Sequence, residues 1–348
     1  MHGRELSVTS PLLSLPGAVP PPDGSVDAGV AWHHGDPLRE QREAERGVVV
    51  VDRSHREVLA VPGEDRLTWL HTITSQHLTG LADGEHTEAL VLDLQGRVEH
   101  HAVLSHADGT VWLDTEPWRS AGLLGYLQQM VFWSAVQPRD ATGELAVLTL
   151  LGPSTGQLLA DFSGGIVRAF DGRADLLVPR ASLVDVWQRF VTAGATPAGT
   201  WAHEALRAVG LRPRMGVDTD DRTIPHEVGW IGPAVHLEKG CYRGQETVAR
   251  VSNLGRPPRR MVLLHLASGD ELPSTGSPVA AGGRTVGRVG TVATHHELGP
   301  IALALVKRSV EPSTPLLAGG VTASIDPDSV PSDTGEPPGR AALRRLRA

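Results

Sequence analysis

The stretch Lys239-Gly240-Cys241-Tyr242-Arg243-Gly244-Gln245-Glu246 holds the side chains with the most evident chemistry in this chain. It contains the only cysteine and one of the two lysines. The charges of Lys239 and Arg243, and a helix expected over Glu246–Asn253, all favour the thiolate of Cys241. A lone cysteine is more often a small buried apolar residue, but a dense polar cluster between glycines favours a reactive thiol here. The candidate catalytic residues are Cys241, Lys239, Arg243, Tyr242, Gln245 and Glu246.

Length and composition bound the class of protein. At 348 residues the chain is long for one hydrophobic core, so two or three domains are expected. A net charge of -8 does not indicate a broad nucleic-acid surface. One cysteine excludes an internal disulfide framework, and no apolar run approaches the roughly twenty residues that span a bilayer. We therefore expect a cytoplasmic protein without a signal peptide.

Upstream of the motif, strands and helices must form the frame that positions it. Two strands are expected at Val48–Val51 and Val58–Val61, followed by a helix with an apolar stripe that includes Leu70. A hairpin is expected over Glu88–Leu104, in which Asp93-Leu94-Gln95-Gly96 forms the turn and its glycine takes a positive φ. These elements predict a sheet with a helix packed on it.

The middle of the chain continues in the same way. A strand pair is expected at Val131–Val136 and Leu145–Leu151, and amphipathic helices at Leu183–Phe190 and Trp201–Val209. The loop Leu211–Pro225 has no sustained period, and a loop of this length inside a compact domain is usually functional. It leads directly into the motif.

Beyond Pro257-Pro258, short alternating strands separated by glycines predict a small antiparallel barrel or sandwich. The expected strands are Met261–Leu266, Pro278–Ala280, Arg284–Val292 and Ile301–Val306. Proline-rich residues 1–30 and charged residues 326–348 are expected to be a flexible lead and a flexible tail.

Other motifs do not indicate a second kind of site. The glycine-rich Gly282–Gly290 lacks a following helix and alternates with valine, so a strand with tight bends is the better interpretation. The adjacent pairs His33-His34, His100-His101 and His295-His296 would point to opposite faces of a strand, so no pair chelates one metal as it stands. A single cysteine also cannot supply the four thiolates that an iron–sulfur cluster usually requires.

The motif matches the signature of the YgfZ family of folate-binding proteins at every position, and the chain resembles that family. This family is related to the glycine-cleavage T protein, an aminomethyltransferase. Supporting matches are His33 to Glu40, Asp93 with Gly96-Arg97, and Arg222-Thr223-Ile224-Pro225-His226-Glu227, so the resemblance spans residues 31–325. It implies an α+β fold: a three-domain ring of aminomethyltransferase type around a hole for tetrahydrofolate, with a small C-terminal antiparallel β-barrel.

The domains implied by the resemblance are discontinuous. Residues 31–60 with 140–257 would form a first α+β domain that carries the motif, 61–139 a second, and 258–325 the barrel. The folate contacts expected in these domains are Asp93, Gly96, Arg97, Glu99, Trp201, His203 and Arg222. Aromatic surface for the pteridine would come from Trp201 or His203, and a guanidinium group for the glutamate tail from Arg97 or Arg222.

Two positions depart from the T protein. Val209 stands where the T protein has a folate-contacting glutamate, and Glu99-His100 replaces the paired aspartates after the glycine turn. Aminomethyl transfer would lose its evident proton handlers without these acids. We therefore expect a protein that is not a conventional enzyme.

The leading hypothesis is a monomeric tetrahydrofolate-binding accessory protein for assembly or repair of iron–sulfur enzymes, which would indirectly support tRNA modification. Its partners would be folate and iron–sulfur enzymes or cluster-assembly proteins, without a membrane or direct RNA contact. The alternative enzyme is a folate-dependent one-carbon (aminomethyl) transferase. A third alternative is a binding module for tRNA or a partner enzyme, although solvated charge is the simpler interpretation of its arginines. Those arginines are Arg207, Arg212, Arg214, Arg256, Arg259 and Arg260.

Overall fold

The computed structural model describes residues 8–254, 256–267, 269 and 271–331. The chain separates into two compact units, each built from three segments of sequence. Unit 1 consists of residues 1–69, 78–87 and 102–206, and unit 2 of residues 70–77, 88–101 and 207–348. The motif therefore lies in the same unit as the C-terminal strands.

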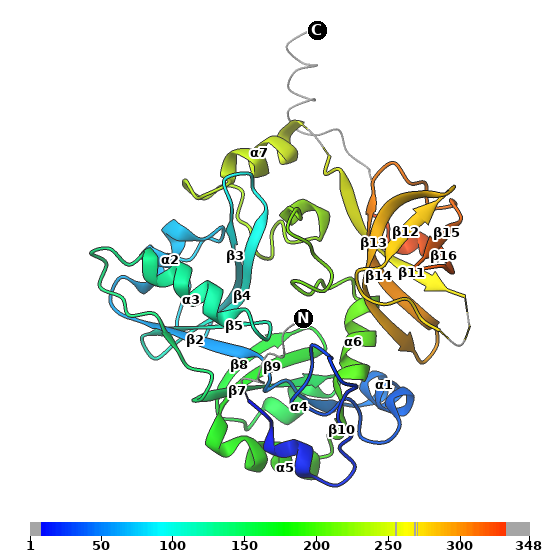
Figure 1. Cartoon of the computed structure of the whole chain (residues 1–348). Coiled ribbons are helices and arrows are strands. Elements are labelled where there is room, and N and C mark those ends of the chain that lie inside the picture. Colours follow the sequence, from blue (N-terminus) through cyan, green and yellow to red (C-terminus); the bar gives the residue numbers. More distant parts are fainter. Residues whose placement is uncertain (1–7, 255, 268, 270, 332–348) are drawn as a thin grey trace. The chain divides into compact units, whose positions relative to one another are not determined.

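A five-stranded sheet with the order β10-β1-β7-β9-β8 forms the core of unit 1 (Figure 1). Its central strand β1 (Val49–Asp52) pairs with β10 (Thr196–Ala198) in parallel and with β7 (Leu145–Leu151) in antiparallel orientation. All three valines of β1 are fully buried, as expected of a strand that is covered on both faces. The remaining strands are β8 (Ile166–Phe170) and β9 (Arg173–Pro179).

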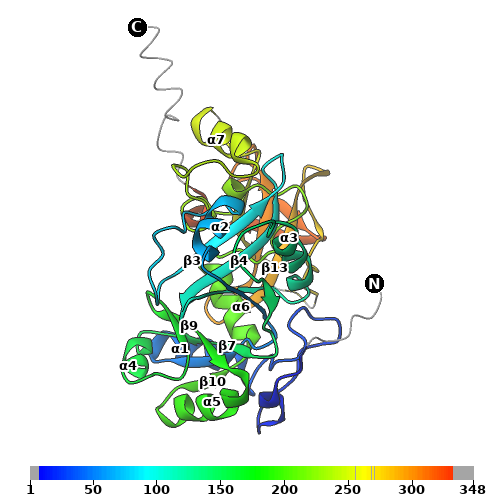
Figure 2. The same ribbon diagram turned by 90° about the vertical axis from the view of Figure 1, so that its left-hand side faces the viewer.

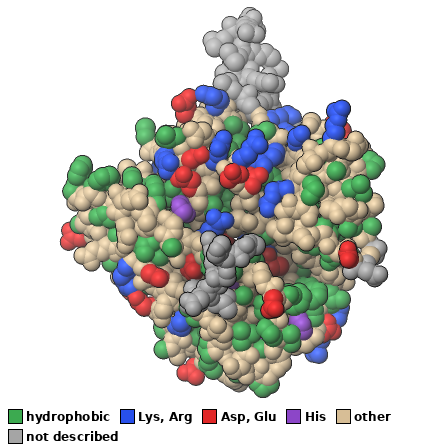
Figure 3. Space-filling view, in the orientation of Figure 1, with side chains coloured by type: hydrophobic (Ala, Val, Ile, Leu, Met, Phe, Trp, Pro, Cys, Tyr) green, Lys and Arg blue, Asp and Glu red, His purple; other side chains and the backbone are tan. Residues whose placement is uncertain are grey.

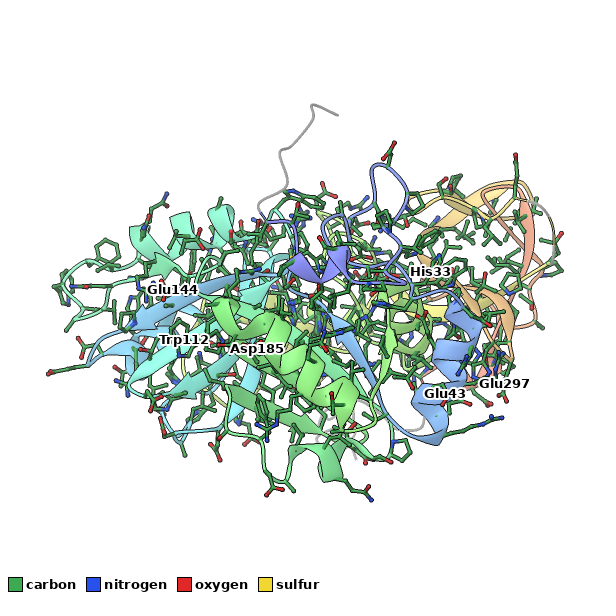
Figure 4. The ribbon with its side chains drawn as sticks, turned by 90° about the horizontal axis from the view of Figure 1, so that it is seen from below. His33, Glu43, Trp112, Glu144, Asp185 and Glu297 are labelled. Atoms are coloured by element: carbon green, nitrogen blue, oxygen red, sulfur yellow. The ribbon has the colours of Figure 1, made fainter. Side chains whose placement is uncertain are left out.

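Helices cover both faces of this sheet. Helix α5 (Leu183–Thr192) packs its apolar side against the cluster around Val50, while its first-turn Asp185 stays exposed (Figures 2 and 4). Ala44 of α1 (Pro37–Arg46) packs against the other face. The Asp36 carboxylate caps α1 by accepting from two backbone N–H groups. The other helices before the motif are α3 (Ser120–Gln129), which packs on β2 and β6 of a second sheet, α4 (Thr155–Leu159) and α6 (Thr200–Val209).

A second sheet has the order β3-β4-β5-β2-β6. Its strands are β2 (Glu57–Pro62), β3 (His86–Leu92), β4 (Val98–Ala107), β5 (Thr110–Thr115) and β6 (Arg139–Asp140). Helix α2 (Arg66–Ile73) follows β2, as the sequence predicts. The chain passes from one unit into the other within α2, β3, β4 and α6.

Unit 2 contains a closed antiparallel barrel with the strand order β11-β14-β13-β12-β15-β16 (Figure 1). The strands are β11 (Arg259–Leu266), β12 (Pro278–Ala281), β13 (Arg284–His295), β14 (Gly299–Lys307), β15 (Leu316–Ala318) and β16 (Val321–Ile325). Gly287 lies in β13, where a Cβ would meet the Leu305 carbonyl oxygen at 2.5 Å, so this glycine allows close packing of neighbouring strands. Of the two architectures that the sequence allowed for these strands, a barrel or a sandwich, the structure shows the barrel.

The two ends of the described chain are more ordered than we expected. Leu12 lies in a short 3₁₀ helix (Pro11–Ser14) and is 1% exposed within the unit 1 core. Residues 8–30 thus make contacts that a flexible lead would not make. At the other end, the Ser329 hydroxyl accepts from the Leu263 backbone N–H of β11. The rest of the expected lead and tail, residues 1–7 and 332–348, lies outside the described residues.

The expected strand Val131–Val136 is wrong. This segment is irregular, and Phe132 and Trp133 are 74% and 94% exposed. The Ala135 backbone N–H donates to the Asp65 carboxylate instead of to a neighbouring strand. An apolar run with aromatic residues resembles a strand in its composition, but no strand among the described residues pairs with it.

Candidate functional site

The hairpin turn between β3 and β4 is the first part of the site. The turn lies entirely in unit 2. Gly96 has a φ of 76°, as predicted from the sequence. The Asp93 carboxylate accepts from the backbone N–H groups of Gln95 and Arg97, both at 2.8 Å. Asp93 therefore fixes the shape of the turn, and its structural role is to bind the backbone.

The motif packs directly on this turn. A Cβ on Gly244 would lie 2.5 Å from the Asp93 carbonyl oxygen, and a Cβ on Gly96 would lie 2.9 Å from Cβ of Thr247. Gly244 also has a φ of 82°. Both glycines are therefore required for close approach, and helix α7 (Gln245–Leu254) starts beside the hairpin tip (Figures 1 and 2).

Lys239 attaches the other end of the motif to the C-terminal end of α2. Its Nζ donates to the backbone carbonyls of His71 and Thr74, the second at 2.5 Å. The residue is only 5% exposed, and this burial lowers the pKa of the amine to about 8. A cation at a helix C-terminus satisfies carbonyls that have no helical partner. Lys239 thus positions the motif, and its tuning of Cys241 stays a prediction.

A set of buried hydrogen bonds joins residues 75–76, which follow α2, to residues 233–236, which precede Lys239. The Ser75 hydroxyl donates to the Ala234 carbonyl at 2.6 Å, and the Gln76 amide donates to the Pro233 carbonyl at 2.9 Å. The His236 backbone N–H donates to the Ser75 carbonyl at 3.0 Å. Ser75 and Gln76 were not predicted from the sequence, although a polar run at the end of an apolar helix is a signal for such bonds.

Cys241 is exposed, whereas its neighbour Tyr242 is buried. The Lys239 Nζ lies 5.1 Å from the centre of the Tyr242 ring, and burial raises the pKa of the tyrosine to about 12. The Gln245 amide donates to the Lys239 carbonyl at 3.3 Å, and exposed Glu246 pairs with Arg250 along the surface of α7. The motif thus presents an accessible thiol on an anchored loop.

Arg243 pairs with Glu99 at 2.8 Å, and both side chains are partly exposed. The backbones of Arg97 and Arg222 also lie near each other. The backbone N–H of Val98, which follows Arg97, donates to the carbonyl of Thr223, which follows Arg222, at 2.8 Å. The side chains of Arg97 and Arg222 are both exposed. The structure therefore brings together three of the predicted cations beside the hairpin turn.

The loop Leu211–Pro225 is ordered, as predicted, and its acids bind arginines of unit 2. Arg259 pairs with Asp220 at 2.6 Å and with Glu227 at 2.7 Å. Burial alone would raise the pKa of Asp220, but hydrogen bonds from Arg259 and Thr223 lower it to about 2. The loop therefore uses its charges to join the motif segment to the barrel.

The remaining predicted folate contacts, Trp201 and His203, lie in unit 1. The Trp201 ring stacks on Trp32 with 4.5 Å between centroids, so one face is already covered. His203 is buried, and its Nδ1 lies 3.2 Å from a Glu204 carboxylate oxygen. Trp201 therefore offers more accessible aromatic surface than His203.

The family models match two parts of the chain. Residues 31–169 match the GCVT N-terminal domain, and residues 259–332 match the CAF17 C-terminal beta-barrel domain. An aminomethyltransferase of Rubrobacter xylanophilus is 28% identical over 288 residues, which make up 75% of this chain and 76% of that protein. The chloroplastic protein At1g60990 of Arabidopsis thaliana, described as a candidate transferase, is 26% identical over 273 residues. That alignment covers 70% of this chain and 62% of the plant protein.

A solved structure shows the fold. Aminomethyltransferase T of the glycine cleavage system from Bartonella henselae matches with a TM-score of 0.77 at 16% sequence identity. The match covers 92% of this chain and 96% of that chain. The expected aminomethyltransferase-type α+β fold with a C-terminal antiparallel barrel is thus confirmed. Among the helices that the structure describes, none is both long and apolar enough to cross a bilayer.

Proposed function

We propose that the protein is a tetrahydrofolate-binding accessory protein of the YgfZ type, which supports assembly or repair of iron–sulfur enzymes through Cys241. One observation carries the proposal: an exposed thiol lies on a loop that buried contacts fix at both ends. Lys239 holds one end and Gly244 the other. A thiol that must meet a partner protein or a reactive group needs this combination of access and support.

The exposed guanidinium groups suit the anionic part of a folate. Arg97 and Arg222 could each bind a carboxylate of the glutamyl tail, because both guanidinium groups are exposed. In the accessory function the chain's own residues would bind and orient the folate without turnover, whereas in the alternative function the bound folate would supply or accept a one-carbon unit.

A titration with tetrahydrofolate tests the binding step. We expect saturable binding without consumption of the folate, and about tenfold or greater weakening in Arg97→Gln and Arg222→Gln, because each removes a charge-assisted hydrogen bond. The matched control is Arg139→Gln, which removes an exposed guanidinium that pairs with Glu144 in unit 1. Folate turnover with an amine donor would instead support the aminomethyltransferase alternative.

The role of the thiol is tested separately. Cys241→Ser should keep tetrahydrofolate affinity but lose support of iron–sulfur enzymes under oxidative stress, since a hydroxyl is not a comparable nucleophile or metal ligand at neutral pH. Equal activity of these enzymes with wild type and the variant would remove the thiol from the mechanism. A cytoplasmic location remains part of the proposal, although one relative is chloroplastic.

A further inference from the structure

Helix α3 of unit 1 presents an outer side without charged residues. Its buried residues Leu123 and Leu127 lie on the side that packs on β2 and β6, whereas Ala121 and Gly122 are exposed on the opposite side. From Ser120 to Pro138 the sequence contains no Asp, Glu, Lys, Arg or His, although 21% of the whole chain is charged. A helix that faces water normally carries charged side chains on its outer side, so this surface is better suited to contact with another molecule.

Gly125, in the middle of this outer side, is not required by packing within the chain. A Cβ at Gly125 would meet no atom of the described residues within 4 Å. Glycine inside a helix is less stable than alanine, and its advantage is that it permits close approach of another group. The exposed neighbours toward the end of the helix are the uncharged Gln128 and Gln129. The surface is therefore flat and made of small side chains at the start of α3.

The loop that follows α3 directs two large aromatic side chains into solvent. Phe132 and Trp133 are 74% and 94% exposed, and their ring centroids are 6.0 Å apart. The loop is fixed where it leaves the helix, because the indole N–H of Trp69 donates to the Met130 carbonyl at 2.8 Å. Phe132 has a φ of 44°, which is a strained conformation for a bulky residue. Aromatic side chains on a fixed backbone lose little entropy on binding and commonly dominate interfaces.

We propose that α3 and this loop form the face through which two copies of the chain associate about a twofold axis. In an antiparallel pair of α3 helices, the start of the helix in one copy lies beside the loop of the other copy. The Trp133 ring of each copy then packs on the small residues Ala121 and Gly122 of its partner, and the same contact is made twice. Large side chains at one end and small ones at the other make the face complementary to itself.

The charges at the two ends of this face are also complementary. Exposed Arg119 precedes α3, and exposed Glu64 lies near the loop, because the Ala135 backbone N–H donates to the neighbouring Asp65 at 2.7 Å. The antiparallel arrangement brings Arg119 of one copy toward Glu64 of the other. The net charge of -8 makes two copies repel each other, so a face without charge at its centre and with opposite charges at its rim is favoured for self-association.

A second copy fits this face better than a membrane surface does. Segments that lie on membranes combine aromatic residues with Lys or Arg on the flanking polar side, which attract anionic lipids. Here Glu64 and Asp65 flank the aromatic loop instead. The proposal replaces the expected monomer with a dimer. It involves neither Cys241 nor the expected folate contacts, so it stands or falls separately from the proposed function.

Sedimentation equilibrium of the full chain between about 1 and 100 µM tests the proposal. We expect the mass to rise from 37.0 kDa toward twice that value with concentration. Trp133→Ser and Gly125→Gln should each weaken association by about tenfold or more, because one removes the aromatic contact and the other blocks close approach. Both positions face solvent or open space, so melting temperatures should stay at or above that of wild type. Leu317→Ser is the matched control, since it removes an exposed apolar side chain of unit 2.

Charge reversal tests the antiparallel arrangement. Arg119→Glu should weaken association severalfold, and adding Glu64→Arg to the same chain should restore it, since the pair is then formed in the opposite sense. A mass of 37.0 kDa at every concentration would overturn the proposal, as would a dimer that Trp133→Ser and Gly125→Gln leave unchanged. Failure of the second reversal to restore association would contradict the antiparallel pairing. Flotation of a monomeric wild type with phosphatidylcholine vesicles, lost in Trp133→Ser, would assign the face to a membrane and also overturn the proposal.

Discussion

At the scale of single residues, the structure changes the interpretation of Lys239 more than that of any other residue in the motif. Its position two residues before Cys241 suggested a cation that stabilises a thiolate. In the structure its ammonium group is buried and donates to the carbonyls of His71 and Thr74. An arginine would not fit this role equally well, since a compact ammonium can approach two converging carbonyls from one point. The survival of a lysine in an arginine-rich chain has a structural explanation here.

Replacing Lys239 with Met should lower the free energy of unfolding by about 1–3 kcal/mol, because two helix-terminal carbonyls lose their donor in a buried place. Urea denaturation followed by circular dichroism measures the change. The chain offers a matched control, since Lys307 is its only other lysine and is exposed. Lys307→Met should stay within about 0.5 kcal/mol of wild type. Equal effects of the two substitutions would contradict the structural role of Lys239.

The pH dependence of stability also tests whether the Lys239 ammonium group is buried. The pKa of Lys239 is about 8 in the folded chain, below its ordinary value of 10.5. Below pH 8 the amine is protonated in both states, so the cost of burying the charge is fully present. Between pH 8 and 10.5 the folded chain releases a proton that the unfolded chain keeps, so stability should rise with pH. Unfolding curves of wild type and Lys239→Met at pH 7.5 and 9.5 should therefore diverge, and parallel curves would refute the expectation.

At the scale of elements, the contact between the hairpin turn and the start of α7 depends on Gly244. Gly244→Ala should destabilise the protein by about 2 kcal/mol or more, because a Cβ would meet the Asp93 carbonyl oxygen at 2.5 Å and φ is 82°. Gly240 is the control within the same motif, since a Cβ there has open space. Thermal unfolding of both variants checks this, and a Gly240→Ala variant that is equally unstable would contradict the model.

Local signals in the sequence were sufficient to predict this hairpin, because the Asp93–Gly96 turn needs only its own aspartate and glycine. The valine run of β1 and the apolar side of α5 were similarly local. The last two barrel strands, β15 and β16, were missed because they are only three and five residues long. Short strands depend on their partners more than on their own composition.

The site could be predicted only in part for a related reason. Cys241 and its neighbours form one continuous stretch, so their grouping was visible in the sequence. The partners of Lys239, which are the carbonyl groups of His71 and Thr74, lie 168 and 165 residues away in the sequence. Long-range hydrogen bonds leave no periodic pattern in a sequence, so only the tertiary structure reveals them.

At the scale of the whole molecule, the net charge and the partners of the arginines help to distinguish a folate-binding protein from an RNA-binding protein. The chain has a net charge of -8, and Figure 3 shows acidic side chains among the Lys and Arg side chains on the face that it presents. Among the arginines considered for RNA, Arg207 and Arg260 are buried and donate to Asp218 and to the Val310 carbonyl. Arg259 is engaged with Asp220 and Glu227. These arginines hold unit 2 together, which replaces the interpretation of them as solvated charge.

We therefore expect no saturable binding of a labelled single-stranded RNA at about 150 mM salt, measured by fluorescence anisotropy. Non-specific binding needs several unpaired cations that release counterions from phosphates, and its affinity falls steeply with salt. A titration at about 50 mM salt distinguishes weak electrostatic contact from true absence, and a basic protein serves as the positive control. Micromolar affinity that declines with a slope of several units in log salt would show a basic surface and restore the RNA hypothesis. A flat response at both salt concentrations would leave the exposed Arg97 and Arg222 available to the carboxylates of a small anionic ligand.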